Sequence, residues 1–322
     1  MPVTVPAPPA APYVHLRAAA GGGVKRWLLH GLLRVGVRHP RLDVSDLGRL
    51  RRQNASFDRR FGRVDPRLRR LPVEAAGVGA EWITVPESRP ERVLFYLHGG
   101  AFCLRFPNTH AALAGRWCRR LAARALLVDY RLAPEHRYPA AVDDCVAAYR
   151  WLLTQTAPEH IVIAGDSAGG NLALATLHRL KADALPLPRC AVLLSPVVDF
   201  TMSSPSLLTN AARDPMFTLE KLTALRQLYA APEQFLEPAL SPLFGDFAGF
   251  PPLLFQAGEI ELLRDESIRA AARAHAAGVT VEVDIWRDMA HVFQALPLPQ
   301  AAIAEDRIAE FIERHAGWTR AA

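Results

Sequence analysis

Cysteine is scarce in this chain and shows no pairing pattern. The 322 residues include only four cysteines, and these lack the close spacing of a metal site or a redox pair. They are Cys103, Cys118, Cys145 and Cys190. We therefore expect no disulfide framework and no metal centre, and a reducing, cytoplasmic environment is the simpler assumption.

Long hydrophobic runs are also missing. No stretch reaches the roughly 18 uninterrupted apolar residues of a transmembrane helix. The opening residues, MPVTVPAPPAAPYVHL, lack the basic segment, apolar core and cleavage site of a secretory signal. We therefore expect no integral membrane segment.

Acidic residues are few in the first part of the chain. Residues 1–70 hold fifteen Lys and Arg but only four Asp and Glu, although the whole chain carries a net charge of just +6. Such a segment can bind nucleic acid or a membrane surface. No nucleic-acid-binding motif accompanies the charge. We interpret RLRRQNASFDRRF as the solvated face of helices and expect no nucleic-acid partner.

The length and the half-hydrophobic composition are otherwise enough for one large α/β domain or two small ones. From Arg92 onward, short apolar runs that end in polar or glycine-rich loops alternate with helical patterns. The predicted strands lie in RVLFYLHGG, ALLVDYRLAP, IVIAGDSAGG, CAVLLSP, PLLFQAG and VEVDIW, with two shorter ones in VEAAGVGAEWITVP. This alternation predicts a mostly parallel sheet covered by helices on both faces. Ligands of such sheets bind at the carboxyl ends of the strands.

Two segments depart from this alternation. Residues 1–70 carry helical apolar spacing that breaks near Pro40, and Asp199–Pro252 offers helical patterns without a strand. We predict a catalytic domain over residues 71–322 with a helical cap insertion at about 200–250. The helices of residues 1–70 are predicted to join that cap.

A serine stands at a cramped corner of this pattern. Gly165-Asp166-Ser167-Ala168-Gly169 fits G-x-S-x-G, preceded by the strand pattern IVIA and followed by the helical pattern NLALA. In that context the turn holds a strained serine whose hydroxyl is exposed at the top of the sheet, beside a helix N-terminus. Side chains at Gly165 and Gly169 would collide with the neighbouring strand and helix. We therefore predict that Ser167 is a nucleophile.

A serine nucleophile needs a base and an oxyanion hole. Of the eleven histidines, His291 follows the final predicted strand, whereas His275 and His315 fall in helical stretches. We therefore predict His291 as the base. The loop FYLHGGAF places Gly100 and Ala101 after an early strand, where small residues let backbone N–H groups approach a carbonyl oxygen.

The segments HGGAF, DYRLAPEHRYPAAVDD, GDSAGGNLA, GEIELLRDES and MAHVF occur in this order. Together they resemble the hormone-sensitive lipase family of α/β hydrolases, the bacterial type IV esterases, from about Glu81 to Phe311. The resemblance implies the α/β-hydrolase fold and hydrolysis of carboxylic esters through an acyl-serine, without a cofactor or metal. The expected ligand is a small-molecule ester. The oligomeric state is left open, with a homodimer among the alternatives.

The resemblance also implies roles for residues around the serine. Ala168 N–H would join those of Gly100 and Ala101 in the oxyanion hole. His98 and Gly99 would shape and brace the loop. A structural polar network behind the site is implied for Asp129, Arg131 and Glu135 of DYRLAPE. Ala101 departs from the family, which more commonly has a third glycine there.

The acid that pairs with the catalytic histidine, the third member of the catalytic triad, is the second departure from the family pattern. The family commonly uses aspartate at this position. The loop EIELLRDES holds Glu259, Glu261, Asp265 and Glu266. Alignment with the family pattern D-x-L-x-D favours Glu261, with Glu259 as the alternative and a solvated loop carboxylate as the plain interpretation of Glu261. Asp265 and Glu266 are interpreted as first-turn acids of the next helix.

Three functions are compatible with these residues. An esterase for short- to medium-chain acyl esters is favoured, since Ala101, Phe102 and Phe106 are expected to crowd the acyl pocket. A lactone hydrolase would use the same tetrahedral intermediate. A ligand-binding protein on an inactive hydrolase fold, as in the plant gibberellin receptors, is disfavoured because those receptors have lost the histidine that His291 supplies here.

Overall fold

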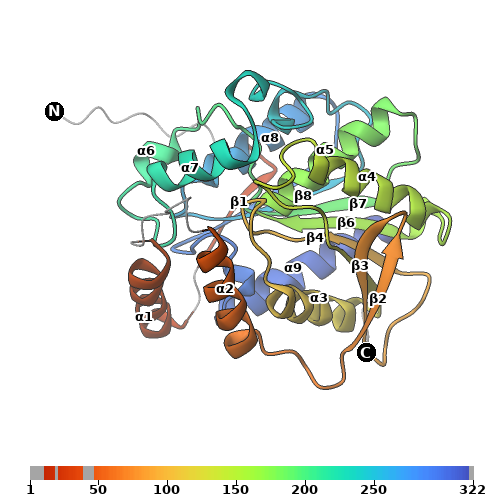
Figure 1. Ribbon diagram of the computed structural model, residues 1–322, viewed down its shortest axis with the longest axis horizontal. Coiled ribbons are helices and arrows are strands. Elements are labelled where there is room, and N and C mark those ends of the chain that lie inside the picture. Colours follow the sequence, from red (N-terminus) through yellow and green to blue (C-terminus); the bar gives the residue numbers. More distant parts are fainter. Residues whose placement is uncertain (1–10, 19–20, 39–46, 319–322) are drawn as a thin grey trace.

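A central sheet organises the molecule (Figure 1). The computed structural model describes residues 11–18, 21–38 and 47–318, and within these the sheet has nine strands in the order β1-β9-β8-β7-β6-β4-β5-β3-β2. The strands are β1 (Val14–Arg17), β2 (Arg69–Ala75), β3 (Val78–Thr84), β4 (Val93–Leu97), β5 (Arg124–Val128), β6 (Ile161–Asp166), β7 (Cys190–Leu194), β8 (Leu253–Gly258) and β9 (Val281–Trp286). All neighbours are parallel except β3, which is antiparallel to both β2 and β5.

The eight strands predicted from the sequence are confirmed as β2 to β9. The ninth, β1, was not predicted. It is a four-residue edge strand whose Val14 pairs with Val283 of β9, so residues 14–17 extend the sheet rather than lie over it.

Helices cover both faces of the sheet, as the alternating pattern predicts. Helices α3 (Pro107–Leu121) and α9 (Pro299–Ala316) lie on one face, and α4 (Ala140–Leu153), α5 (Ala168–Ala182) and α8 (Arg264–Ala276) lie on the other (Figure 1). Alternate strand residues enter separate cores. Phe95 of β4 packs with α4 and α5, whereas its neighbour Tyr96 packs with α3. The central strands are buried on both sides for this reason.

The remaining helices gather beyond one end of the strands (Figure 1). They are α1 (Gly23–Leu33), the π-helical turn η1 (Arg34–Arg38), α2 (Leu47–Phe61), α6 (Ser206–Thr209) and α7 (Leu219–Tyr229), followed by short 3₁₀ turns. Residues 200–252 contain no strand, as predicted. The predicted break near Pro40 lies outside the described residues.

Helix α2 is tied to the body of the protein through a buried carboxylate. Asp58 accepts hydrogen bonds from the backbone N–H groups of Asn108 (2.8 Å) and Thr109 (2.9 Å) at the start of α3. An acceptor at this position satisfies donors that a helix N-terminus leaves free.

Candidate active site

Ser167 occupies the sharp turn between β6 and α5. Its backbone has φ 53° and ψ −119°, a strained conformation for a residue with a side chain. The turn is held by a 2.8 Å bond from Ser167 N–H to the Leu194 carbonyl. A β-carbon at Gly165 would overlap the Gly169 carbonyl, and one at Gly169 would overlap the Leu97 carbonyl of β4. The predicted need for small residues at both positions is confirmed.

His291 and Glu261 are brought together from two neighbouring loops. His291 follows β9, Glu261 follows β8, and the two strands are adjacent in the sheet. The histidine Nδ1 lies 2.8 Å from Glu261 Oε2, and both side chains are buried. The opposite ring nitrogen, Nε2, is buried without a hydrogen-bond partner in the described part of the chain.

This contact determines how the histidine titrates. Burial by itself lowers the pKa of His291, but the hydrogen bond and negative charge of Glu261 outweigh it and raise the pKa above its usual value. Burial raises the pKa of Glu261, against the opposing effect of His291. A carboxylate at Nδ1 favours the tautomer that leaves Nε2 free to accept a proton.

Polar side chains from the 200–252 segment hold the loop that carries Glu261. Asn210 Nδ2 donates to the carbonyls of Glu259 (2.9 Å) and Glu261 (2.8 Å). Asp214 accepts the Leu262 N–H at 2.8 Å, and the Ser206 hydroxyl donates to the Leu262 carbonyl at 2.6 Å. All three side chains are buried. The 200–252 segment therefore holds the backbone on both sides of the Glu261 carboxylate.

The other acids of this loop have different partners. Glu259 accepts the Asp288 N–H at 3.0 Å and lies 3.5 Å from Arg213. Asp265 pairs with Arg264 in the first turn of α8. Glu266 also lies in that turn, as predicted, but it is buried and accepts hydrogen bonds from the N–H groups of Val198 and Asp199 in the loop after β7.

The loop after β4 presents backbone donors. Gly100 has φ 130° and Ala101 has φ 53°, and the turn is closed by bonds from Cys103 and Leu104 N–H to the Gly100 carbonyl. A β-carbon at Gly100 would overlap the Leu104 carbonyl. The N–H groups of Gly100, Ala101 and Ala168 have no hydrogen-bond partner among the residues that the structure describes.

His98 braces this loop from behind. Its Nδ1 lies 2.7 Å from the Gly99 carbonyl, and its ring stacks on Tyr130 at 4.3 Å. The Tyr130 hydroxyl donates to the His98 carbonyl at 2.6 Å. Burial, with the neighbouring His110, lowers the pKa of His98 to about 3, so the ring is neutral at physiological pH.

Asp166, the second residue of the G-x-S-x-G turn, connects this loop to the serine. Its carboxylate accepts hydrogen bonds from the Tyr96 hydroxyl (2.8 Å) and Gly99 N–H (3.0 Å), and lies near His110. Burial would raise the pKa of Asp166, but the His110 charge and these hydrogen bonds lower it. Sequence reasoning assigned it no role, because its partners come from β4 and α3.

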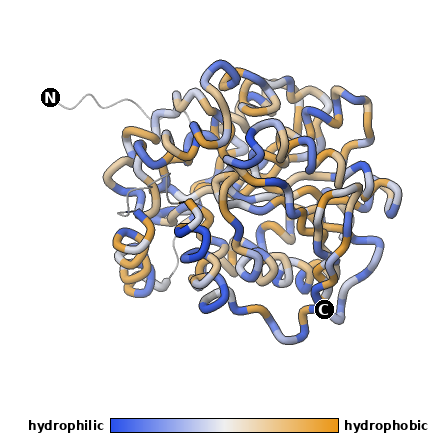
Figure 2. The backbone as a smooth tube through the Cα atoms, in the orientation of Figure 1, coloured by the Kyte–Doolittle hydropathy of each residue, from blue (hydrophilic) through white to orange (hydrophobic). Residues whose placement is uncertain are grey.

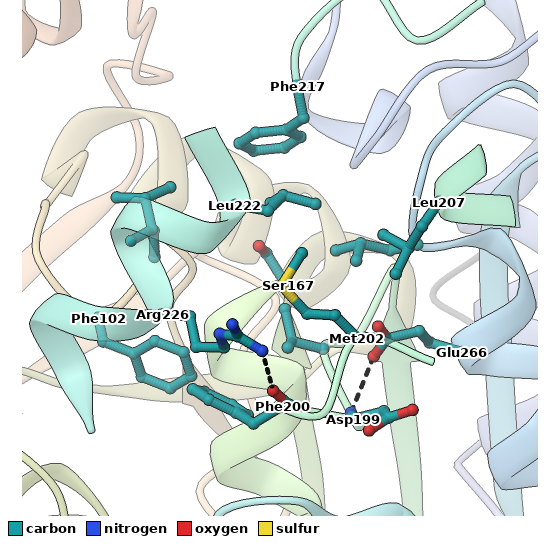
Figure 3. A pocket seen from close by; sticks show the side chains of 14 residues that line it. Phe102, Ser167, Asp199, Phe200, Met202, Leu207, Phe217, Leu222, Arg226 and Glu266 are labelled. Atoms are coloured by element: carbon teal, nitrogen blue, oxygen red, sulfur yellow. Dashed lines mark hydrogen bonds between the residues drawn. The ribbon is translucent and has the colours of Figure 1, made fainter. Parts of the chain in front are cut away.

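Ser167 opens into a mainly apolar pocket (Figure 3). Its wall includes Ala101, Phe102, Phe200, Met202, Phe217 and Leu222. Three polar side chains, Asp199, Arg226 and Glu266, also line it. Seven of the fourteen lining residues come from the 200–252 segment, so this segment supplies half of the pocket wall.

Of two expectations about surrounding residues, the one for Phe106 is wrong and the one for the charged residues of DYRLAPE stays a prediction. Phe106 is not among the residues that line this pocket; it is the N-cap residue of α3 and its ring meets His110 edge-on. The three charged residues of DYRLAPE do not contact one another. The observed ion pairs are Asp129 with Arg105, Arg131 with Asp144 and Glu135 with Arg51.

Neither a metal site nor a membrane-spanning helix is found in the part of the chain that the structure describes. Within the described ranges, no cluster of three or more His, Cys, Asp or Glu side chains is arranged to hold a metal ion. No helix in that same part of the chain combines the length and apolarity needed to cross a bilayer. All four cysteines are buried and unpaired.

Comparison with known proteins agrees with this geometry. A family model described as the α/β hydrolase fold matches residues 94–295. An esterase of Acinetobacter venetianus is 39% identical over 251 residues, covering 77% of this chain and 82% of its own. The crystal structure of an esterase from the bacterial hormone-sensitive lipase family is 37% identical, with a TM-score of 0.86, over 92% of this chain and 99% of its own. The esterase EstE5, soaked with p-nitrophenyl butyrate, has the same identity and TM-score over 92% and 100%.

Proposed function

The chain belongs to the hormone-sensitive lipase family of α/β hydrolases and is a carboxylic ester hydrolase, and we propose that it cleaves short- to medium-chain acyl esters through an acyl-serine on Ser167. The observation that carries the assignment is the strained Ser167 turn, opening into the same pocket as Ala101 of the glycine-rich loop. The His291–Glu261 pair is the chemical partner such a serine requires.

In this proposal His291 acts as general base and then as general acid. Its Nε2 takes the Ser167 proton as the hydroxyl oxygen attacks the ester carbonyl, and later donates that proton to the departing alcohol. Water then attacks the acyl-serine with the same histidine as base, which releases the carboxylic acid and restores the serine. Glu261 holds the ring and stabilises the imidazolium that forms at each attack.

The N–H groups of Gly100, Ala101 and Ala168 form the proposed oxyanion hole. Their lack of protein acceptors leaves them available for the negative oxygen of the tetrahedral intermediate. Ala168 adds the favourable field of the α5 N-terminus. Loss of one such donor slows comparable enzymes by about 10²–10³ in kcat.

The aromatic wall of the pocket and the methyl group of Ala101 support the acyl preference. Phe102 stacks on Tyr229 with ring centroids 3.8 Å apart, which fixes an aromatic wall beside Ser167. Ala101 adds a methyl group where the family commonly has glycine. EstE5, which shares the fold at 37% identity, was soaked with a butyrate ester, and a chain of that length is the kind we propose here.

We further propose that the helical part of residues 1–70, which holds α1, η1 and α2, forms one cap with the segment at 200–250. Arg38 donates to the carbonyls of Ala211 (2.6 Å) and Asp214 (2.9 Å), and Lys221 donates to the carbonyl of Val37. These contacts join η1 to the segment that lines the pocket. Four unpaired cysteines support a cytoplasmic location.

The test is a panel of p-nitrophenyl esters from acetate to palmitate, together with five- and six-membered lactones and emulsified triolein. We expect butyrate to hexanoate esters to have the highest kcat/KM. Faster turnover of triolein than of butyrate would contradict the acyl preference, and faster turnover of a lactone would favour the alternative lactonase function. Ser167→Ala assayed on the same panel controls for contaminating esterase.

A further inference from the structure

Helix α1 turns an apolar face to the outside of the molecule. Five large hydrophobic side chains within twelve residues are more than half exposed: Val24 (75%), Trp27 (73%), Leu28 (53%), Leu32 (70%) and Val35 (75%). The spacing of Val24, Leu28 and Val35 places them on one side of the helix and of η1. Figure 2 shows this helix as a mainly hydrophobic coil at the edge of the molecule. Scattered single hydrophobics on a surface are ordinary, but a contiguous stripe marks an interaction site.

The opposite face of α1 is fastened to the protein. Leu29 packs against the cluster around Trp286, Met289 and Phe293, and Arg26 lies 3.6 Å from Asp288. These contacts lie on the loop that leads to His291. The apolar stripe is therefore the outer face of an anchored helix, and its exposure follows from the direction in which the helix is held.

The charged residues of α1 and η1 are all cationic, although Asp288 of a neighbouring loop lies beside Arg26. Residues 23–38, GVKRWLLHGLLRVGVR, contain no acidic residue. Lys25 and Arg34 are exposed and flank the stripe on its two sides. An apolar helix face with tryptophan, bordered by cations, matches what lies in the interface of a negatively charged lipid bilayer.

We propose that α1 docks on an anionic lipid surface, with Trp27, Leu28 and Leu32 in the boundary of the acyl chains and Lys25 and Arg34 at the phosphates. Arg34 and Arg38 also bond carbonyls between Ala211 and Asp214. Docking therefore brings the loop that leads to Phe217, in the pocket wall, close to the lipid surface. A second copy of this chain is a less suitable partner for the apolar face of α1, because a symmetric contact through α1 would bring the cations of both copies together.

The experiment is flotation of the purified full-length protein with vesicles. Vesicles of phosphatidylcholine alone are compared with vesicles that contain phosphatidylglycerol, at low and high salt. We expect binding to the phosphatidylglycerol vesicles that weakens as salt rises, because the cationic contribution is screened. Leu28→Asp should reduce the partition coefficient by roughly tenfold or more, the loss expected from one buried leucine. Leu236→Asp, which changes a leucine that is also more than half exposed (67%) but lies far along the chain, should bind like wild type.

Two further variants test the charge of Lys25 and the insertion of Trp27 separately. Lys25→Glu should lose binding to phosphatidylglycerol vesicles with an unchanged melting temperature. Brominated acyl chains should quench part of the wild-type tryptophan emission, and Trp27→Phe should remove that quenched part. The proposal is overturned if wild type does not float at low salt, if Leu28→Asp floats as well as wild type, or if Leu28→Asp converts a dimer that ignores vesicles into a monomer.

Discussion

Oε2 of Glu261 lies 2.8 Å from Nδ1 of His291, in a pair that is shielded from water. The contact fixes the ring so that Nε2 is the nitrogen available for proton transfer. Glutamate is one methylene longer than the aspartate common in this family. The backbone carbonyls of Glu259 and Glu261 are both held by Asn210, so the longer side chain starts from a fixed position.

Replacing Ser167 by alanine should remove ester hydrolysis while the fold is retained. Loss of the nucleophile in a serine hydrolase costs on the order of 10⁶ in kcat. The hydroxyl makes no contact on which the turn depends, because the backbone N–H of Ser167 holds it through Leu194. Steady-state rates with p-nitrophenyl butyrate and a melting curve check both parts. Activity within tenfold of wild type, in protein free of other esterases, would exclude Ser167 as the nucleophile.

Glu261→Gln should lower kcat by orders of magnitude with little change in KM. The amide keeps the size of the side chain but loses the charge that stabilises the imidazolium in the transition state. Glu259→Gln on the same loop and Asp265→Asn in the first turn of α8 are matched controls, since neither side chain contacts His291. If Glu259→Gln were the inactive variant and Glu261→Gln stayed near wild type, the acid would be misassigned.

The rate should fall on the acidic side at a higher pH than an ordinary histidine would cause. In the proposed mechanism hydrolysis needs neutral His291, and Glu261 raises the pKa of that ring, with smaller contributions from Asp214 and Asp166. A raised pKa means that protonation, and loss of activity, begins sooner as the pH falls. The acidic limb of kcat/KM against pH reports this value. In Glu261→Gln, the limb of the residual activity should move to lower pH; a limb that does not move would show that another group controls it.

The sheet could be predicted from sequence because its strands are short apolar runs with clear ends. The residues of β4 and β6 are buried on both faces of the sheet, so both strands consist mainly of apolar residues. Such an apolar run is enough to predict a buried parallel strand. β1 was missed for the opposite reason. It is four residues long and its Leu16 is exposed. It forms a strand only because it pairs with β9, where Val14 lies opposite Val283, 269 residues further along the chain.

The candidate site also contains residues that the sequence indicates and residues that only the fold brings together. Ser167 and His291 stand out by motif and by position after a strand, and the family pattern singled out Glu261. Asn210 and Asp214 carry no motif, since their role arises only where the insertion meets the acid loop. Glu266 fits a first-turn acid locally, and nothing in its neighbourhood along the chain indicates that the loop after β7 covers it.

Asn210→Ala should reduce kcat by about tenfold and leave KM nearly unchanged. The substitution removes two buried hydrogen bonds from the backbone of the acid loop, at a typical cost of ~1 kcal/mol or more each, and lets Glu261 drift from His291. Ser241→Ala is a suitable control, because it too removes a buried donor to a carbonyl, that of Phe235, in the same insertion. We expect Ser241→Ala to lose stability but keep its kcat. If Asn210→Ala behaves in the same way, Asn210 has only a structural role.

Glu266→Gln should make the protein less sensitive to alkaline pH. The carboxyl is buried and accepts hydrogen bonds from the N–H groups of Val198 and Asp199. Burial is the largest influence on its pKa, the nearby Asp199 charge adds to it, and the two N–H groups and Arg269 oppose it; the net result is a pKa of about 8.

The direction of the effect follows from proton linkage. A carboxyl whose pKa is raised in the folded state keeps its proton there after the unfolded chain has released it. Below the unfolded pKa, near 4.5, this group costs the fold nothing, and stability is lost as the pH rises from there through about 8. Glutamine retains a carbonyl oxygen for the two N–H groups and cannot ionise. Melting temperatures of wild type and Glu266→Gln, measured from pH 5 to pH 9, should therefore diverge as the pH rises, with the variant relatively more stable at the alkaline end. Parallel curves would mean that Glu266 ionises in the folded protein as readily as in the unfolded chain.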